Sequence, residues 1–519
     1  MSSPLPPPLL AWFRRHRVSW AGLRFEVAEG RGVYGVAEVD LNPGSVVVAV
    51  PKAAMLTRKN VRDANALHAL LALGLPSVEV LGLAIALERA AGKSSKWHAY
   101  LQSLPLHEPL PLLWSAAELR MLAGTGLDET SQRRKRRLLE NYRSAVEEWE
   151  GAAPLPSSEE YLRACTLSSS RAFLVDGEHG EGLVPLADLL NHKAALAEEQ
   201  GDEGDEGDEG DEGDEGDEGD EGAELRCDCT LRIPPAEGEE EEEGEGEEEE
   251  EGEGEEEEEG EGEEEEEGEG EGEGEGEGEG EGEGEGEEAA LVGTARPLRA
   301  GEEVCHTYGP LGNWELLAGY GFALPADNPF DTALLPWRAL VGAAEAALGA
   351  RAARRRLAEL RAAGCWHALL GSPFVFDRSG VPPGELRLLL RLLCATPLPP
   401  WATDASAPRA AKLRAAALSE AAAAPRALGE ISERAVLRAA IYAHLDSYAA
   451  AGAPLPTKRQ RTAAPAAPSS QLRRRHAERL VAGERDIWAA ALAGGRQLEG
   501  REAAAAVAGA LARRRRLEA

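Results

Sequence analysis

The chain has 519 residues, with 94 Asp and Glu against 55 Lys and Arg, and a formal net charge of −39. More than half of the acidic residues fall between Glu198 and Glu288, where there are only two basic residues, so the rest of the chain is net basic. This split excludes a uniformly acidic, solvating protein. It predicts a cationic globular body of roughly 430 residues, enough for two or three domains, that carries a polyanionic insert.

The first predicted unit, from Leu23 to Pro51, is short, rich in β-forming residues and interrupted by a turn at Asn42–Gly44. It predicts a small antiparallel β unit. Its glycine cluster Gly30–Gly35 matches G-x-G-x-x-G, but a dinucleotide-binding loop must open a helix, whereas β-branched residues follow here. Two explanations of the glycines stay open: a tight hairpin turn, or a close approach of the backbone to a ligand.

The hydrophobic period then becomes helical over residues 63–167, which predicts a helical insertion of roughly a hundred residues. Strand character returns in five short segments, so the β unit lies on both sides of this insertion. These segments are 171–175, 182–186, 225–233, 291–297 and 303–308. Beyond residue 336 the chain is rich in Ala, Leu and Arg at helical spacing, which predicts a separate all-α domain.

The predicted fold class is therefore α+β. The β-rich domain has an N-terminal part, 9–62, and a C-terminal part, 168–335, with the helical insertion at 63–167 between them. The all-α domain covers 336–519 and resembles a substrate-binding domain. The apolar part of residues 9–16 is too short for a signal peptide, and no apolar run approaches the length of a membrane span. We expect a protein of the cytoplasm or nucleus.

Two acidic inserts interrupt the C-terminal part of the β-rich domain. Residues 198–222 contain seven Gly-Asp-Glu triplets, and residues 237–288 consist almost wholly of Glu and Gly. Such sequences cannot bury a core, so we expect disordered loops around one hairpin strand. Three interpretations remain open: a tolerated loop expansion, an electrostatic autoinhibitor of the basic body, or a binding segment for a basic partner.

The six cysteines follow no pairing rhythm, and no secretory segment precedes them, so we expect reduced thiols. Cys227 and Cys229 share one face of a predicted strand, but a lone C-x-C without a further Cys or His cluster is a poor zinc site. We expect no metal. The remaining cysteines are Cys165, Cys305, Cys365 and Cys394.

Four short segments occur in a fixed order: Gly30–Gly35, Arg171–Phe173, Asp188–His192 and Tyr308–Phe322. As an ordered set, together with Gly92–His98, they resemble the SET-domain protein methyltransferases. The similar branch has a split SET domain and a helical C-terminal domain, and includes the Rubisco large-subunit lysine methyltransferase. The resemblance implies a monomeric enzyme that transfers a methyl group from S-adenosylmethionine to a lysine of a non-histone protein, without a metal.

The resemblance also implies roles for single residues. Tyr308 matches the catalytic tyrosine, whose hydroxyl orients the acceptor nitrogen beside the transferring methyl group. The residues implied to hold S-adenosylmethionine are Glu29, Gly30, Arg31, Asn191, His192, Tyr308 and Phe322. Those implied to contact the substrate are Arg171, Phe173 and Tyr320. In the last segment, we expect Asn313 to cap a short helix that ends at Gly319.

Histidine is the alternative acceptor, because one branch of similar enzymes methylates histidine. Phe173 and Ala187 match the lysine type, where the histidine type has asparagine and tryptophan. An aromatic channel suits an aliphatic stem and its ammonium, whereas imidazole needs a polar partner for its second nitrogen. A non-catalytic acidic scaffold with the same fold is a further alternative, which the presence of Asn191 and Tyr308 disfavours.

Overall fold

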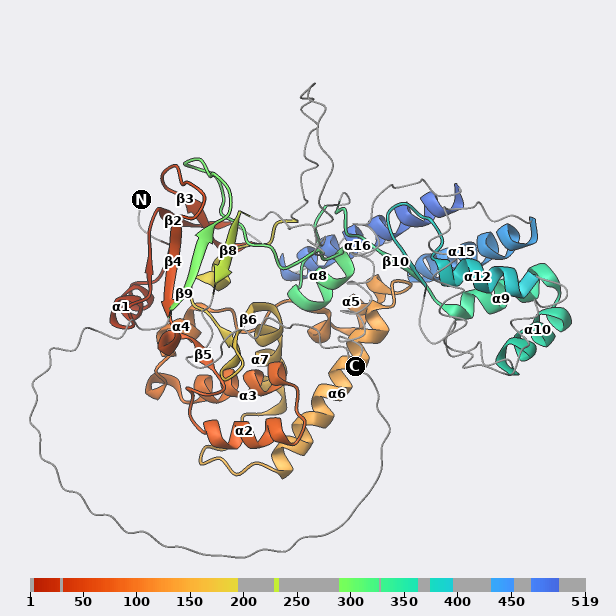
Figure 1. Cartoon of the computed structure of the whole chain (residues 1–519). Coiled ribbons are helices and arrows are strands. Elements are labelled where there is room, and N and C mark those ends of the chain that lie inside the picture. Colours follow the sequence, from red (N-terminus) through yellow and green to blue (C-terminus); the bar gives the residue numbers. More distant parts are fainter. Residues whose placement is uncertain are drawn as a thin grey trace, which may run out of the picture.

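The computed structural model describes residues 4–28, 31–194, 228–232, 289–325, 328–362, 374–394, 431–451 and 468–493. The predicted acidic inserts 198–222 and 237–288 lie outside the described residues, as do Cys227 and Cys365. The described part combines a β-rich region with helices α2–α7 packed below it, and a group of C-terminal helices on the other side of α8 and α16 (Figure 1).

The main sheet joins strands from both sides of the helical insertion. Its order is β1-β4-β9-β8, and every neighbouring pair is antiparallel. The predicted pairing of the strand between the two acidic inserts is confirmed, because β8 pairs with β9 from Cys229 opposite Thr294 to Arg232 opposite Leu291. The strands are β1 (Ser19–Trp20), β4 (Val46–Pro51), β8 (Cys229–Arg232) and β9 (Ala289–Thr294).

The glycine cluster lies in a hairpin. Strand β2 (Leu23–Ala28) pairs with β3 (Gly32–Ala37), and Gly32 takes a φ of +74°, a conformation that glycine adopts without strain. A strand follows the cluster where a dinucleotide-binding loop would need a helix, so the exclusion of that motif is confirmed. A third sheet, in the order β5-β7-β6, contains β5 (Leu56–Thr57), β7 (Gly180–Leu183) and β6 (Ala172–Asp176).

Helices fill the segment between β5 and β6. Helix α7 is fixed at its N-terminus by a capping box between Ser157 and Glu160, and ends at Arg171, where β6 begins. This junction delivers Arg171 and Phe173 to one edge of the sheet. The helices are α2 (Ala64–Ala72), α3 (Ser77–Ala90), α4 (His98–Ser103), α5 (Ala116–Leu119), α6 (Leu127–Glu147) and α7 (Ser158–Arg171), with 3₁₀ turns η2 (Gly92–Ser94), η3 (Pro111–Leu113) and η4 (Arg120–Leu122).

Sequence periodicity missed one helix and two short strands. Helix α1 (Pro7–Arg15) buries Leu9, Trp12 and Phe13 against the main core. Within residues 336–519, expected to be all helical, β11 (Phe374–Phe376) is a strand, and it pairs with β10 (Ala333–Leu335) just before this range. Both strands have three residues, too few for an alternating pattern to show. The helices of this region are α9 (Trp337–Leu348), α10 (Ala350–Ala362), α12 (Gly384–Cys394), α15 (Ile431–Ala451) and α16 (Pro468–Leu492).

Helix α8 (Asn313–Tyr320) corrects the two predictions about its ends. Gly312 is the residue before the first turn, and the helix ends at Gly321 with a φ of +82°. Asn313 is no cap. Its buried side-chain amide donates to the carbonyl of Leu324 and accepts the N–H of the same residue, so both its nitrogen and its oxygen are bonded, whereas a cap would use only the oxygen. Gly319 lies inside the helix. None of the described helices has the length and apolar character needed to cross a membrane.

Candidate active site

The two most informative sequence segments meet in space. The residues around His192 and His306 form a parallel bridge. The N–H of His306 donates to the carbonyl of Asn191 at 2.9 Å, and the N–H of Lys193 donates to the carbonyl of His306 at 3.1 Å. The chain on both sides of the acidic segment therefore builds one site.

Tyr308 is fixed at three points of this site. Its N–H donates to Nδ1 of His192 at 3.1 Å, across 116 positions of the chain. Its hydroxyl donates to the carbonyl of Leu190 at 3.0 Å, and its ring stacks on Tyr320 with centroids 4.6 Å apart. Burial raises the pKa of Tyr308 above its ordinary value near 10. The hydroxyl therefore stays protonated at neutral pH and its position is set by the backbone.

A cavity of about 200 Å³ opens beside Tyr308. It brings together the three residues predicted to contact substrate, Arg171, Phe173 and Tyr320, with the predicted catalytic tyrosine. Helix α7 and β6 supply the first two, and α8 supplies the third. The remaining lining residues are Ser170, Ala172, Ala187, Asp188, His306 and Thr307. The volume suits one slender side chain, not a large ligand.

The charge of Arg171 is engaged within the protein. Its Nε donates to Glu108 at 2.7 Å, and Nη1 donates to the carbonyl of Asp188 at 2.8 Å. The hydroxyl of Tyr100 donates to Oδ2 of Asp188 at 2.8 Å, while Oδ1 of that buried carboxyl has no hydrogen-bond partner among the described residues. Burial raises the pKa of Asp188 in spite of the arginine. Arg171 thus lies between two carboxyl groups, that of Glu108 and, at 3.7 Å, that of Asp188 in the cavity wall, an arrangement that sequence inspection did not predict.

On the neighbouring side of the site, Glu303 joins two of the residues predicted to hold a cofactor. Its Oε1 accepts from Arg31 at 2.5 Å and from the side-chain amide of Asn191 at 2.9 Å. Glu303 was missed by sequence reasoning, because one acidic residue in a predicted strand gives no pattern. Glu29 and Gly30 lie outside the described residues.

His192 presents an unused donor. Its Nδ1 accepts the N–H of Tyr308, so the ring proton is on Nε2, which is buried and has no partner among the described residues. Burial, with the nearby His306, lowers the pKa of His192 to about 4. The ring is therefore neutral near pH 7. The ring of Phe322 lies 6.2 Å from it. A buried N–H of this kind is a group that a bound ligand can satisfy.

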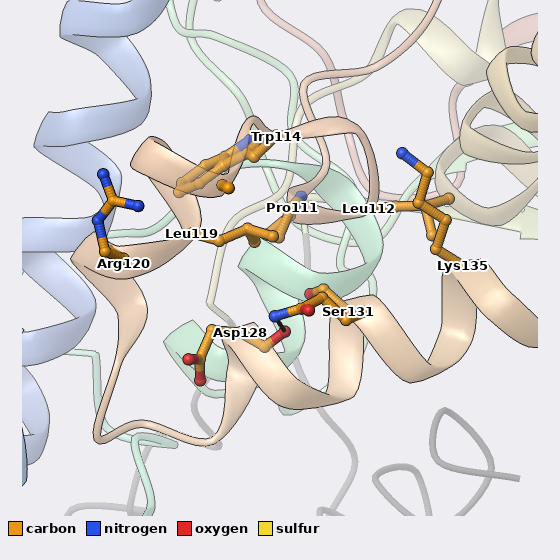
Figure 2. A pocket seen from close by; sticks show the side chains of 10 residues that line it. Pro111, Leu112, Trp114, Leu119, Arg120, Asp128, Ser131 and Lys135 are labelled. Carbon is orange, nitrogen blue, oxygen red and sulfur yellow. Dashed lines mark hydrogen bonds between the residues drawn. The ribbon is translucent and has the colours of Figure 1, made fainter.

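A second cavity, of about 210 Å³, lies between η3, α5 and α6. Figure 2 shows the indole of Trp114 above Leu119 and Pro111, with Asp128 and Ser131 of α6 on the opposite side. None of the residues predicted to contact cofactor or substrate lines it. Its lining mixes charges of both signs around an apolar floor, and it has no link to Tyr308. The described residues contain no group of three or more His, Cys, Asp or Glu arranged for a metal ion.

Solved structures resemble this chain over almost its full length. The SET domain of LSMT bound to lysine and AdoHcy superposes with a TM-score of 0.55, at 16% identity, over 94% of this chain and 90% of that one. The fold of this chain is a SET-domain fold. The same SET fold relates it to Rubisco LSMT bound to sinefungin and monomethyllysine, with a TM-score of 0.52 at 17% identity over 97% of this chain and 96% of that one.

Curated relatives match shorter parts of the chain. N-lysine methyltransferase setd6 of Salmo salar is 35% identical over 105 residues, 20% of this chain and 23% of that protein. Ribosomal lysine N-methyltransferase set10 of Schizosaccharomyces pombe is 63% identical over 35 residues, 7% of this chain and 6% of that protein. The chain therefore matches less than a quarter of the length of either relative. No protein-family profile matches the chain.

Proposed function

We propose that the protein is an S-adenosylmethionine-dependent protein-lysine N-methyltransferase. The observation that carries the proposal is the position of Tyr308, whose fixed hydroxyl lies at a cavity of about 200 Å³ with Phe173 and Tyr320 in its walls. The similarity to N-lysine methyltransferase setd6 and to the lysine-bound SET domain of LSMT supports the same activity.

The residues beside the cavity fit S-adenosylmethionine by the chemistry of their donors. The amino-acid end of that molecule carries an ammonium and a carboxylate, which match the carboxylate of Glu303 and the guanidinium of Arg31. The amide oxygen of Asn191 adds an acceptor, and Nε2–H of His192 adds a buried donor. Bound there, S-adenosylmethionine supplies an electrophilic methyl group. We propose that Phe322 packs beside it, with Glu29 and Gly30 next to Arg31 in the chain.

The acceptor amine must lose its proton before it can attack a methyl group. A free lysine has a pKa near 10.4, so only about one molecule in a thousand is neutral at pH 7.4. An amine that enters between Phe173, Tyr308 and Tyr320 loses part of its contact with water, and desolvation lowers the pKa of an amine. The cavity thus raises the fraction of lysine that can react.

Tyr308 orients the amine. Its hydroxyl proton is committed to the carbonyl of Leu190, so the lone pairs of the oxygen remain to accept an N–H of the acceptor. This hydrogen bond points the nitrogen lone pair away from the tyrosine and toward the electrophile, which is the alignment that an in-line displacement needs.

Lysine is preferred over histidine as the acceptor. The apolar part of the cavity includes Phe173 and Ala187, and an aliphatic stem with a terminal amine needs no polar partner along its length. An imidazole would need a partner for its second nitrogen. In the wall, Arg171 already bonds its neighbours, whereas Oδ1 of Asp188 has no partner among the described residues and is the group that a histidine acceptor would use.

The test is to incubate the full chain with S-adenosylmethionine carrying a labelled methyl group and a cell extract, and then to hydrolyse the labelled proteins to amino acids. Methyllysine in a non-histone protein is the expected product. Methylhistidine would move the protein to the alternative acceptor class. S-adenosylhomocysteine binding without any transfer would instead indicate a non-catalytic scaffold and contradict the proposal.

Two properties complete the proposal. The chain acts as a monomer in the cytoplasm or nucleus. Light scattering tests the oligomeric state, and imaging of a fluorescent fusion tests the location.

The acidic inserts 198–222 and 237–288 bind a basic protein, because their charge is opposite to that of such a partner. Binding of a basic protein that weakens steeply with salt supports this role, and binding that is insensitive to salt contradicts it.

A further inference from the structure

Helix α16 reaches the residue that follows the channel wall. The N–H of Ala323, the residue after Phe322, donates to Nδ1 of His476 at 3.0 Å. The carbonyl of the same Ala323 accepts from Nη1 of Arg479 at 2.7 Å. His476 and Arg479 are three positions apart, on one face of the helix. Both polar groups of one buried peptide position are thus held by side chains from a segment about 150 positions away.

We infer that His476 and Arg479 are positioning residues, which hold in place the segment that links Tyr320 of the cavity wall to Phe322 beside His192. This inference rests on the proposed function for its catalytic consequence, but not for its geometry. The segment after Gly321 belongs to no helix or strand, so its backbone must find other partners. Ala323 finds both on α16, and Leu324 finds both on the side chain of Asn313.

The consequence for the site follows from the neighbours of this segment. Tyr320 stacks on Tyr308, and the ring of Phe322 lies 6.2 Å from His192. If Ala323 moves, the rings of Tyr320 and Phe322 are no longer held in these positions. Loss of order at this wall affects the entry and alignment of an acceptor more than the hydroxyl of Tyr308, which is held by Leu190 and not by α16.

The two contacts are built for neutral pH. His476 and Ala323 are 7% and 1% exposed, so neither can replace its partner with water. Nδ1 of His476 must be unprotonated to accept, and burial, with the charges of Arg479 and Arg475, lowers the pKa of His476 to about 4. Arg479 supplies a charge-assisted donor to the carbonyl.

Helix α16 is anchored independently of these two contacts. Near the N-terminus of α16, Arg473 pairs with Glu118 at 3.0 Å. Glu118 also belongs to the capping box of α5. Ala477 and Leu480 pack in a small apolar cluster with Trp314 of α8 and Leu122 of η4. Figure 2 shows the segment that carries Arg120 next to the blue ribbon of this region, and α16 contacts both α5 and η4. A change at position 476 or 479 should therefore leave the helix docked.

The direct test is amide hydrogen exchange read at Ala323. His476→Leu removes the acceptor, and we expect exchange at Ala323 to become at least about tenfold faster. His476→Asn places an amide oxygen where Nδ1 was, and should restore most of the protection. Unchanged exchange in the leucine variant, with a folded protein, would overturn the inference. If His476→Leu fails to fold, Arg479→Ala against Arg479→Lys gives the same comparison through the carbonyl.

Methyl-transfer kinetics give the second readout. For His476→Leu and Arg479→Ala we expect kcat/KM for the acceptor to fall about tenfold, and KM for S-adenosylmethionine to rise about threefold through Phe322, with both changes reversed in His476→Asn. The control is Arg474→Ala, an exposed arginine of the same helix, which should match the wild type. Equal losses for both substrates in His476→Leu and His476→Asn would indicate a merely structural role and contradict the inference. If the wild type transfers no methyl group, the proposed function fails, and the exchange data alone still decide the positioning role.

Discussion

The two walls of the candidate channel are held in different ways. The wall of Tyr308 is held by its own domain, through backbone bridges between the segments 190–193 and 305–308 and a bond to Leu190. The opposite wall contains Tyr320, and the segment that continues from it through Phe322 is bonded at Ala323 by side chains of α16, in the C-terminal region. The residues proposed for the chemistry therefore lie within the SET fold, whereas the other side of the proposed acceptor channel depends on α16 of the C-terminal region.

The largest effect is expected from a change in the Tyr308 wall. Tyr308→Phe removes the hydroxyl that orients the amine, so the transfer rate should fall by about 10²–10³. Affinity for S-adenosylhomocysteine should stay within about threefold of wild type, because the ring and the backbone N–H remain. Steady-state kinetics and calorimetry measure the two quantities.

Tyr142→Phe is the matched control for this change, since Tyr142 also donates its hydroxyl to a backbone carbonyl, that of Pro156, outside the candidate site. It should keep the wild-type rate. Full activity of Tyr308→Phe would mean that the Tyr308 hydroxyl has no part in methyl transfer.

The next effect tests the support beneath the Tyr308 wall. Arg171→Met removes the cation that pairs with the carboxyl groups of Glu108 and Asp188, leaving two poorly solvated carboxyl groups without it. We expect the free energy of unfolding to fall by about 3–5 kcal/mol in urea denaturation. Arg163→Met, which breaks an exposed pair with Glu159 on the same helix α7, should cost less than about 0.5 kcal/mol. Equal losses would remove the special role of the Arg171 cluster.

The α16 support should respond to pH. His476 has a pKa of about 4 in the folded chain and about 6.5 when unfolded, so the unfolded state binds the extra proton between these values. Its contribution to stability is full above pH 6.5 and is lost as the pH falls toward 4, by about 3 kcal/mol. In His476→Asn this component is absent. Urea denaturation of both proteins from pH 7 to pH 4 should show the wild type losing more stability, and parallel curves would refute the assignment.

A smaller effect concerns the cofactor side of the Tyr308 wall. Asn191→Ala removes an amide that donates to Glu303 and offers its oxygen to a ligand. The dissociation constant for S-adenosylhomocysteine should rise about tenfold, the loss of one or two hydrogen bonds to a charged partner. Calorimetry measures it, and an unchanged constant would detach Asn191 from the cofactor site.

The smallest expected effect is that of the acidic inserts. Deleting residues 198–222 and 237–288 should leave the transfer rate within about threefold of wild type at physiological salt, because long surface insertions cost little. A large rise in rate at low salt, which disappears at high salt, would show that the inserts inhibit the basic body. Rates measured from low to high ionic strength decide between these outcomes.

The same contrast explains what the sequence could predict. Tyr308, Asn191 and His192 stand in short segments whose order along the chain could be recognised in the sequence. In the structure the backbones of these segments bridge one another. Helix α8 was predicted in the right place, but Asn313 was assigned to a cap because its sequence position suits one. Its bonds to Leu324 depend on a turn that only the folded chain forms.

The contacts of α16 with Ala323 could not be predicted from the sequence. His476 and Arg479 lie in an arginine-rich helix whose composition is uniform, and a side chain that bonds a backbone group about 150 positions away leaves no periodic pattern. Glu303 was missed for a related reason, because a single carboxylate acquires meaning only when Arg31 and Asn191 arrive beside it. Local motifs therefore predicted which residues gather at the candidate site, and long-range contacts had to come from the structure.

The most direct test of the account is a crystal structure of the chain with S-adenosylhomocysteine and free lysine. We predict the lysine stem between Phe173, Tyr308 and Tyr320, with its amine within hydrogen-bond distance of the Tyr308 hydroxyl and facing the sulfur of the ligand. A structure with S-adenosylhomocysteine bound elsewhere, or with lysine excluded from this cavity, would contradict the central claim that these two walls form a methyl-transfer channel.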